Sequence, residues 1–119
     1  MVNSRTKGHN YEREIVHALR EELGTIVDEP IKRILDQYRE NSLPDIVVGP
    51  FAIECKRYSQ GCVPHRAWWD QVVAAGTAND LIPALVYRFD RAKARCVVPL
   101  YAINPDLPRS NESRATKDW

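Results

Sequence analysis

The sequence lacks a long apolar run and has no strong excess of either charge. No stretch approaches the ~18–20 consecutive apolar residues that cross a bilayer, which argues against a transmembrane protein. The first ten residues are polar and basic and lack the apolar core of a signal peptide, so we expect a cytoplasmic protein. Lys and Arg number 17 and Asp and Glu 16, and the net charge of +1 therefore predicts no particular partner.

Cysteine is scarce as well. Cys55, Cys62 and Cys96 are an odd number without a signal peptide, so we expect reduced thiols rather than a disulfide framework. Cys62 and His65 form half of a zinc signature and lack a partner pair, so we predict no zinc site. The chain has 119 residues, of which 44% are hydrophobic and 28% charged, and this composition is typical of one globular domain.

The chain is expected to have three parts. Residues 1–9 are polar and basic with no apolar periodicity, which predicts a flexible arm. The apolar periodicity is strong over residues 10–104, which predicts the folded domain. Residues 105–119 contain two prolines and mixed charges, so we expect a tail that is ordered only if it docks on another surface.

Periodicity within the domain predicts helices and strands. Apolar residues recur every four residues over 10–23 and stop at Gly24, which predicts a first helix. Glu12 and Glu14 would then lie in its first turn, where acidic side chains suit the helix dipole. The other elements are a short helix over 31–40, strands over 45–48 and 51–58, a helix over 65–79, and strands over 81–89 and 95–103. This order predicts a small α/β or α+β domain with a mixed sheet.

The sequence places two carboxylates and one amine on neighbouring predicted strands. Side chains alternate along a strand, so Glu54 and Lys56 share one face and Cys55 points to the other. Asp45 begins the preceding strand, and it comes close to Glu54 if the two strands pair as a hairpin. An acidic residue pair with a lysine beside it is therefore expected at one place on the sheet.

This arrangement suits a divalent metal ion. Two neighbouring carboxylates repel each other and raise each other's pKa, and a divalent cation removes the repulsion. Carboxylate oxygens suit Mg²⁺ or Mn²⁺, which lowers the pKa of water and stabilises charge on a phosphodiester. Lys56 would orient the attacking water or stabilise the phosphate, and the sequence leaves both roles open. The alternative is an exposed Glu54–Lys56 ion pair beside a Pro-Asp turn.

The motif Pro44-Asp45…Glu54-Cys55-Lys56 resembles the signature of the PD-(D/E)xK nuclease superfamily. The heptapeptide Gly-His-Asn-Tyr-Glu-Arg-Glu at 8–14 resembles the first helix of the archaeal-type Holliday junction resolvases, and similar small nucleases are encoded by bacteriophages. The resemblance covers roughly Lys7 to Val86. It implies a single restriction-endonuclease-like domain of the α/β (α+β) class, with a central mixed β-sheet flanked by helices.

The resemblance also implies roles for particular residues. Glu12, Asp45, Glu54 and Lys56 would be catalytic. Asp45 and Glu54 would bind Mg²⁺, or Mn²⁺ in its place, with the Cys55 backbone carbonyl as a third ligand. The implied enzyme is a homodimer that acts in DNA recombination and repair by cutting opposing strands of a four-way junction.

Basic residues around the motif predict a DNA-binding surface. They are Arg5, Lys7, Arg13, Lys32, Arg33 and Arg57. Arg13 would contact a phosphate or brace the site. Gln71, on the helix after the catalytic strand, is interpreted equally well as active-site support or as an ordinary exposed residue. Trp68 and Trp69 are expected to pack in the core or at a subunit interface.

The substrate remains open at this stage. The stretch 31–41 is longer and more helical than the resemblance to archaeal resolvases would lead us to expect. A less structure-selective nuclease for flaps, single strands or duplex DNA is one alternative. A non-catalytic DNA-binding protein on the same fold is the other.

Overall fold

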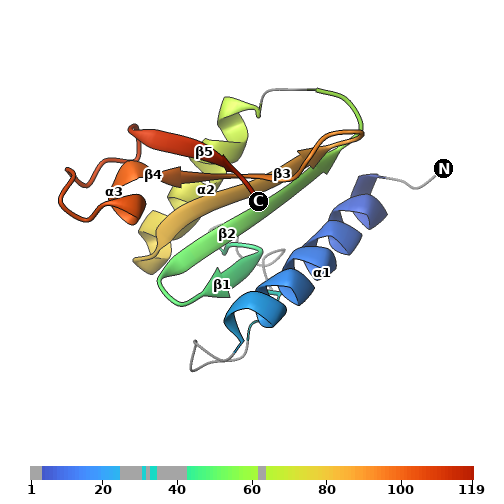
Figure 1. The fold of residues 1–119 in the computed structure, drawn as a ribbon, viewed down its shortest axis with the longest axis horizontal. Helices are drawn as coiled ribbons and strands as arrows, with labels where there is room; N and C mark the ends of the chain where they lie inside the picture. The colour runs from blue at the N-terminus through green and yellow to red at the C-terminus, as the bar shows by residue number, and fades with distance from the viewer. Residues whose placement is uncertain (1–3, 25–30, 32, 35–42, 62–63) are drawn as a thin grey trace.

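The fold is known from a computed structural model that describes residues 4–24, 31, 33–34, 43–61 and 64–119. The elements are α1 (Ser4–Leu23), β1 (Ile46–Val48), β2 (Phe51–Tyr58), α2 (Arg66–Asn79), β3 (Ile82–Phe89), β4 (Arg95–Pro99), α3 (Leu100–Ile103) and β5 (Arg114–Asp118). The strands form one sheet in the order β1-β2-β3-β4-β5 (Figure 1). β2 and β3 are parallel and the other neighbours antiparallel, so the sheet is mixed, as predicted.

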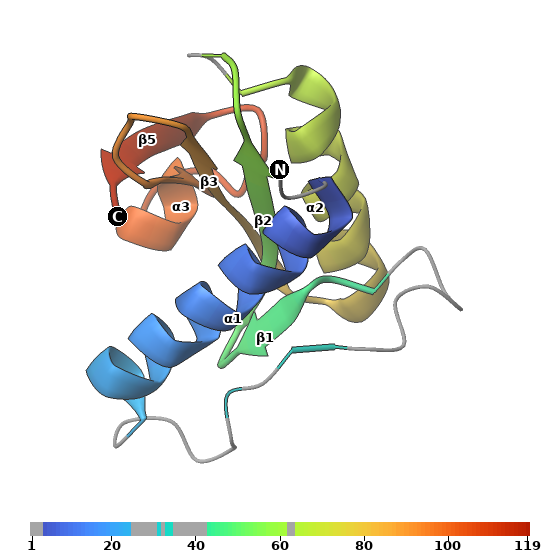
Figure 2. The ribbon, with the colours of Figure 1, turned by 90° about the vertical axis from the view of Figure 1, so that its right-hand side faces the viewer.

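Helices α1 and α2 cover opposite faces of the sheet, as Figure 2 shows. One core cluster joins α1 to the sheet face that carries Ile53 and Cys55. A second cluster joins Trp68 and Trp69 of α2 to β3 and β4, which confirms that these two side chains pack in the core. None of the helices in the described part of the chain is long and apolar enough to cross a membrane.

The β1–β2 hairpin forms as the sequence predicted. Gly49 begins its turn with a φ of 53°, a left-handed conformation that glycine adopts without steric cost. Ile46 lies opposite Ile53 in the antiparallel register. β2 runs from Phe51 to Tyr58, the predicted bounds, because alternating apolar residues follow a clear turn.

The first helix is longer than predicted. α1 begins at Ser4, so the expectation of a flexible arm is wrong for residues 4–9. The Lys7 ammonium lies 3.1 Å from the Asp90 carboxylate in the turn after β3, and this contact holds the polar start of the helix against the sheet. Because α1 starts at Ser4, Glu12 lies beyond the first turn and the helix-dipole interpretation is wrong.

The predicted tail also belongs to the fold. β4 ends at Pro99 and is followed by α3, where a strand through Ile103 had been predicted. Proline has no N–H to continue a ladder, which favours the end of the strand there. β5 then returns and pairs antiparallel with β4, so the sheet has a fifth strand from a segment with little apolar signal.

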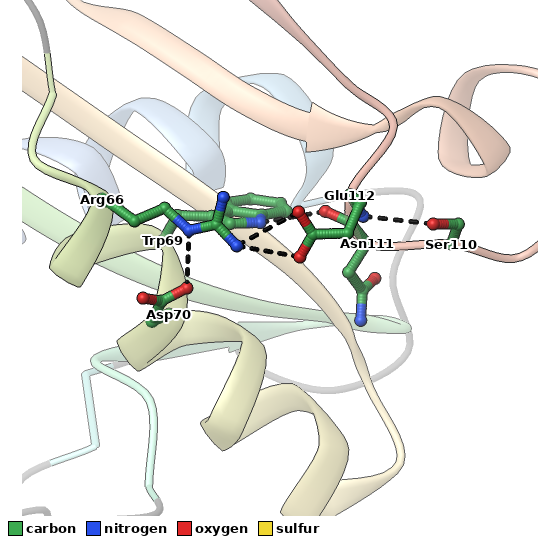
Figure 3. Close-up of polar contacts among 6 residues, drawn as sticks. All are labelled: Arg66, Trp69, Asp70, Ser110, Asn111 and Glu112. Carbon is green, nitrogen blue, oxygen red and sulfur yellow. Dashed lines mark hydrogen bonds and ion pairs between the residues drawn. The ribbon is translucent and has the colours of Figure 1, made fainter.

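The segment before β5 docks on α2 (Figure 3). The indole N–H of Trp69 donates a hydrogen bond of 3.0 Å to the Asn111 carbonyl. Arg66 forms ion pairs with Asp70 at 2.9 Å and Glu112 at 2.8 Å. Exposed ion pairs contribute little to stability, so the indole hydrogen bond and the ring packing are the main local contacts. This is the surface on which the expected tail becomes ordered.

Most of the predicted second helix lies outside the described residues. Arg33 forms an isolated antiparallel bridge with Ile46, and the Ile34 N–H donates to the Asp45 carbonyl at 2.7 Å. The chain is therefore extended beside β1 at these residues, and the prediction of a helix is wrong here. Unpaired groups of the short strand β1 favour this pairing over a helical turn.

Candidate active site

Asp45 and Glu54 lie together at one edge of the sheet. Asp45 directly precedes β1, and the β1–β2 register, continued by one residue, places it opposite Glu54. Its Oδ2 accepts a hydrogen bond of 2.8 Å from the Cys55 N–H. The Asp45 carboxylate thus accepts the hydrogen bond that a backbone carbonyl would accept if the pairing of β1 with β2 continued. Both side chains are buried, with relative exposures of 6% for Asp45 and 2% for Glu54.

The Glu54 carboxyl is in an unfavourable place for a negative charge. Its Oε1 is buried and has no hydrogen-bond partner among the described residues. Burial, the charge of Asp45 and a hydrogen bond with Asp45 together raise the pKa of Glu54 from 4.5 to about 9; burial is the largest cause, and Lys56 lowers the pKa in part. The carboxyl pair therefore holds either a proton or a cation at neutral pH.

Lys56 and Cys55 point to opposite faces of β2. Lys56 is half-buried on the face of Glu54, whereas the Cys55 side chain packs in the core cluster with α1. Burial raises the pKa of the Cys55 thiol well above its usual value, so the thiol is not a ready ligand or nucleophile. The Cys55 N–H faces Asp45, and the carbonyl of the same residue in a strand points to the same side. The backbone oxygen of Cys55 therefore faces the edge where Asp45 lies.

Glu12 reaches the same edge from α1. Its side chain is 6% exposed and forms an ion pair with Arg33 at 3.1 Å. The charge of Glu12 is among the causes that raise the pKa of Glu54 and of Cys55, which indicates that it lies near both. The structure therefore brings together the four residues predicted to be catalytic, Glu12, Asp45, Glu54 and Lys56.

Arg33 belongs to this site rather than to an open basic surface. Its guanidinium is 17% exposed and its buried Nε has no partner among the described residues. The bridge between Arg33 and Ile46 holds it next to Asp45. The sequence marked Arg33 for DNA binding but gave no signal for its pairing with Glu12, which lies 21 residues away.

Two other predicted DNA-binding residues share one carboxylate. Lys7 and Arg57 both form ion pairs with Asp90, and we call these three residues the Asp90 cluster. The hydrogen bond from Lys7, followed by that from Arg57, lowers the pKa of Asp90. One negative charge is thus shared by two cations at the end of β2 and the start of α1.

The remaining predicted residues are apart from these contacts. Arg13 is exposed on α1 and donates a hydrogen bond of 3.1 Å to Asn10. Gln71 is exposed on α2, and its role as active-site support stays a prediction. Lys32 and the side chain of Arg5 lie outside the described residues.

The turn between β3 and β4 carries basic residues that sequence reasoning missed. Arg91 and Lys93 are exposed in this turn, and Arg95 is exposed at the start of β4. Their alternation with alanine from the predicted turn into the next strand was a signal for a solvent-facing basic segment. Only Arg95 has an ion pair described, with Asp118 at 3.5 Å, so this turn adds positive charge to the end of the sheet where β2 finishes.

The fold and the site together define a class of protein. An Asp at the start of one hairpin strand, an E-x-K sequence on the next and a helical crossover to a parallel third strand are the features of a PD-(D/E)xK nuclease. Residues 3–116 match the family described as "Phage putative PDDEXK endonuclease", and the chain belongs to this family. The predicted resemblance is therefore confirmed.

A solved structure supports the same fold. The chain is similar to Archaeoglobus fulgidus Hjc, a Holliday junction resolvase from an archaeal hyperthermophile, with a TM-score of 0.54 and 22% sequence identity. The similarity covers 94% of this chain and 84% of that chain, and it confirms the restriction-endonuclease-like fold. Among curated proteins no relative matches.

Proposed function

We propose that this endonuclease is Mg²⁺-dependent and hydrolyses phosphodiesters in branched DNA, with four-way Holliday junctions as its substrate. The observation that carries the proposal is the buried Glu54 oxygen, which has no hydrogen-bond partner among the described residues and lies beside Asp45 at the sheet edge, with Lys56 on the same face. A phage enzyme of this kind would act in the host cytoplasm during DNA recombination and repair.

The residues at the sheet edge fit a hard divalent cation. Asp45, Glu54 and the Cys55 carbonyl are all oxygen donors, which Mg²⁺ and Mn²⁺ prefer. The described part of the chain contains no group of three or more His, Cys, Asp and Glu side chains that would hold a metal by itself. The protein would therefore supply two carboxylates and a backbone oxygen, with water completing the shell, as is usual for Mg²⁺.

Each side chain then has a chemical task. When bound, Mg²⁺ would lower the pKa of a water molecule and stabilise negative charge on the phosphate. Asp45 and Glu54 would hold the ion, and Lys56 would supply hydrogen-bond donors to the attacking water or to the phosphate. Glu12 would add negative charge to the site, and its ion pair with Arg33 keeps its carboxylate oriented toward the edge.

DNA contact and assembly follow from size and charge. Backbone phosphates would be bound by Arg13, by Lys7 and Arg57 of the Asp90 cluster, and by the predicted Arg5 and Lys32. A chain of 119 residues is small beside a four-way junction, so we infer a homodimer whose two sites cut opposing strands. Gln71 would support the site from α2.

The test compares a labelled four-way junction with a linear duplex of the same sequence, in Mg²⁺ and in EDTA. The variants are Asp45→Asn and Glu54→Gln, which remove charge and keep the size of the side chain. Asp45→Asn also retains an oxygen that can accept the Cys55 hydrogen bond. Asp106→Ala, which removes an exposed carboxylate between α3 and β5, is the matched control.

The expected result is paired, symmetric nicks in the junction, only with Mg²⁺, in the wild type and the control. Both site variants should bind DNA and leave it uncut. Equal cutting of junction and duplex would refute junction selectivity and indicate a general nuclease. Binding in EDTA without cutting in Mg²⁺ would refute catalysis and indicate a DNA-binding protein, and cutting by both site variants would refute the assigned site.

A further inference from the structure

Tyr58 is an exposed aromatic residue beside the site. It is the last residue of β2 and lies two residues beyond Lys56, on the same face of the strand. Two residues of a strand span about 7 Å, so the Tyr58 ring follows closely after the catalytic lysine. Its relative exposure is 42%, although most aromatic residues of the described chain are buried.

The ring of Tyr58 is held from behind. It stacks on Trp68 of α2 with a centroid distance of 4.9 Å and an angle of 18° between planes. Trp68 is 7% exposed and packs against Phe89 at 5.9 Å, so the support is part of the core. The stack covers one face of Tyr58 and leaves the rest of the ring at the surface. The residue therefore presents a fixed aromatic surface at little further cost in side-chain entropy.

A turn with basic residues begins beside Tyr58. The Tyr58 carbonyl accepts a hydrogen bond of 3.1 Å from the Asp90 N–H, so the turn after β3 starts beside it. That turn carries the exposed Arg91 and Lys93 described above and leads into the exposed Arg95 at the start of β4. An aromatic surface together with a basic track is the combination with which proteins bind single-stranded nucleic acid. Bases of an intact duplex are stacked on one another and offer no free face to a protein ring.

From these observations we propose that Tyr58 stacks on an unpaired base close to the phosphate that the enzyme cuts, while the basic turn binds the phosphates that follow. The proposal rests on the proposed nuclease function and refines its substrate class. The enzyme would select DNA with an unpaired or unstacked nucleotide at the cut, such as a branch point or a single-stranded segment. Tyr58 is then a specificity residue that contacts DNA.

The experiment measures binding separately from cleavage. Ca²⁺ replaces Mg²⁺, and gels verify that the DNA stays intact. Single-stranded DNA, a branched DNA and a duplex carry the fluorescent base 2-aminopurine at successive positions. The variants are Tyr58→Leu, which removes the ring, and Tyr58→Phe, which retains it. Tyr101→Leu removes a half-buried ring of α3, at the other end of the sheet, and thermal unfolding verifies that each variant folds.

Base–aromatic stacking predicts a loss of about 5- to 150-fold in single-strand affinity for Tyr58→Leu. Duplex affinity should change little, and Tyr58→Phe and Tyr101→Leu should behave like the wild type. In the wild type, 2-aminopurine fluorescence should be quenched at one or two neighbouring positions of the unpaired strand. This scan needs no variant and therefore does not depend on variant folding.

Two results would overturn the proposal. One is equal loss of affinity for single-stranded and duplex DNA in Tyr58→Leu, and the other is quenching that has no preferred position. The nuclease function is judged separately, by cleavage in Mg²⁺. Position-specific quenching without cleavage would refute the nuclease proposal and retain the stacking role. Cleavage with no dependence on Tyr58 would retain the nuclease proposal and refute the stacking role.

Discussion

Replacing Glu54 by glutamine should stabilise the metal-free protein, by an amount that grows with pH. Burial beside Asp45 raises the pKa of the Glu54 carboxyl from 4.5 to about 9. The folded carboxyl pair therefore keeps a proton that the unfolded chain loses once the pH exceeds 4.5. Because the unfolded state then binds fewer protons, the free energy of unfolding falls as the pH rises.

The size of the effect follows from the width of this pH window. One proton retained by the folded state alone gives a slope of about 1.4 kcal/mol per pH unit. The wild type should then lose about 4 kcal/mol between about pH 5 and pH 8, a large part of the ~5–15 kcal/mol that holds a domain together. Glutamine does not titrate, so the variant should lack this slope.

Urea unfolding in EDTA, repeated across this pH range, measures the difference. Glu22→Gln, which neutralises an exposed carboxylate on α1, is the control and should follow the wild type. Mg²⁺ added at the upper end of the range should stabilise the wild type and leave Glu54→Gln unchanged, because the ion replaces the proton. Parallel curves for the wild type and Glu54→Gln would refute the reasoning, since they would show that the pair retains no proton.

Three further predictions concern other contacts. Arg33→Gln removes one partner of the largely buried Glu12 carboxylate and should cost about 3 kcal/mol in urea unfolding, while an unchanged midpoint would mean that Glu12 is solvated. Asp90→Asn frees the two cations of the Asp90 cluster, so DNA affinity should fall more steeply as the salt concentration rises. An unchanged salt dependence would show that the cluster does not contact DNA. Trp69→Phe keeps an aromatic ring but loses the indole hydrogen bond and part of the buried ring, so thermal unfolding should show a loss of at least about 1 kcal/mol, whereas full stability would assign the order of this segment to other contacts.

The sequence predicted those parts of the site that depend on local periodicity. Side-chain alternation placed Glu54 and Lys56 on one face and Cys55 on the other, and the glycine turn paired Asp45 with Glu54. Both are short-range consequences of strand geometry. The resemblance then added Glu12, whose nearness to the sheet no local pattern encodes.

Most of the missed features depend on contacts between distant segments. Ser4 begins α1 although the first residues have no apolar periodicity, and Lys7 is held by Asp90, 83 residues later. Arg33 pairs with Glu12 only after both chain segments reach the same sheet edge. β5 has few apolar residues, and it is fixed by its ladder with β4 and by the docking of Asn111 on Trp69.

The shortness of β1 has a consequence for the lifetime of the active state. Asp45 is attached to a strand of three residues, at the outer edge of the sheet. Edge elements with few hydrogen bonds open in local fluctuations that leave the rest of a domain intact. Amide protons of β1 should therefore exchange with solvent sooner than those of β3, and heating should abolish activity before it melts the sheet. A ligand that bridges Asp45 and Glu54 would slow that opening. The molecules that carry such a ligand would then be both the active ones and the ones that resist heating.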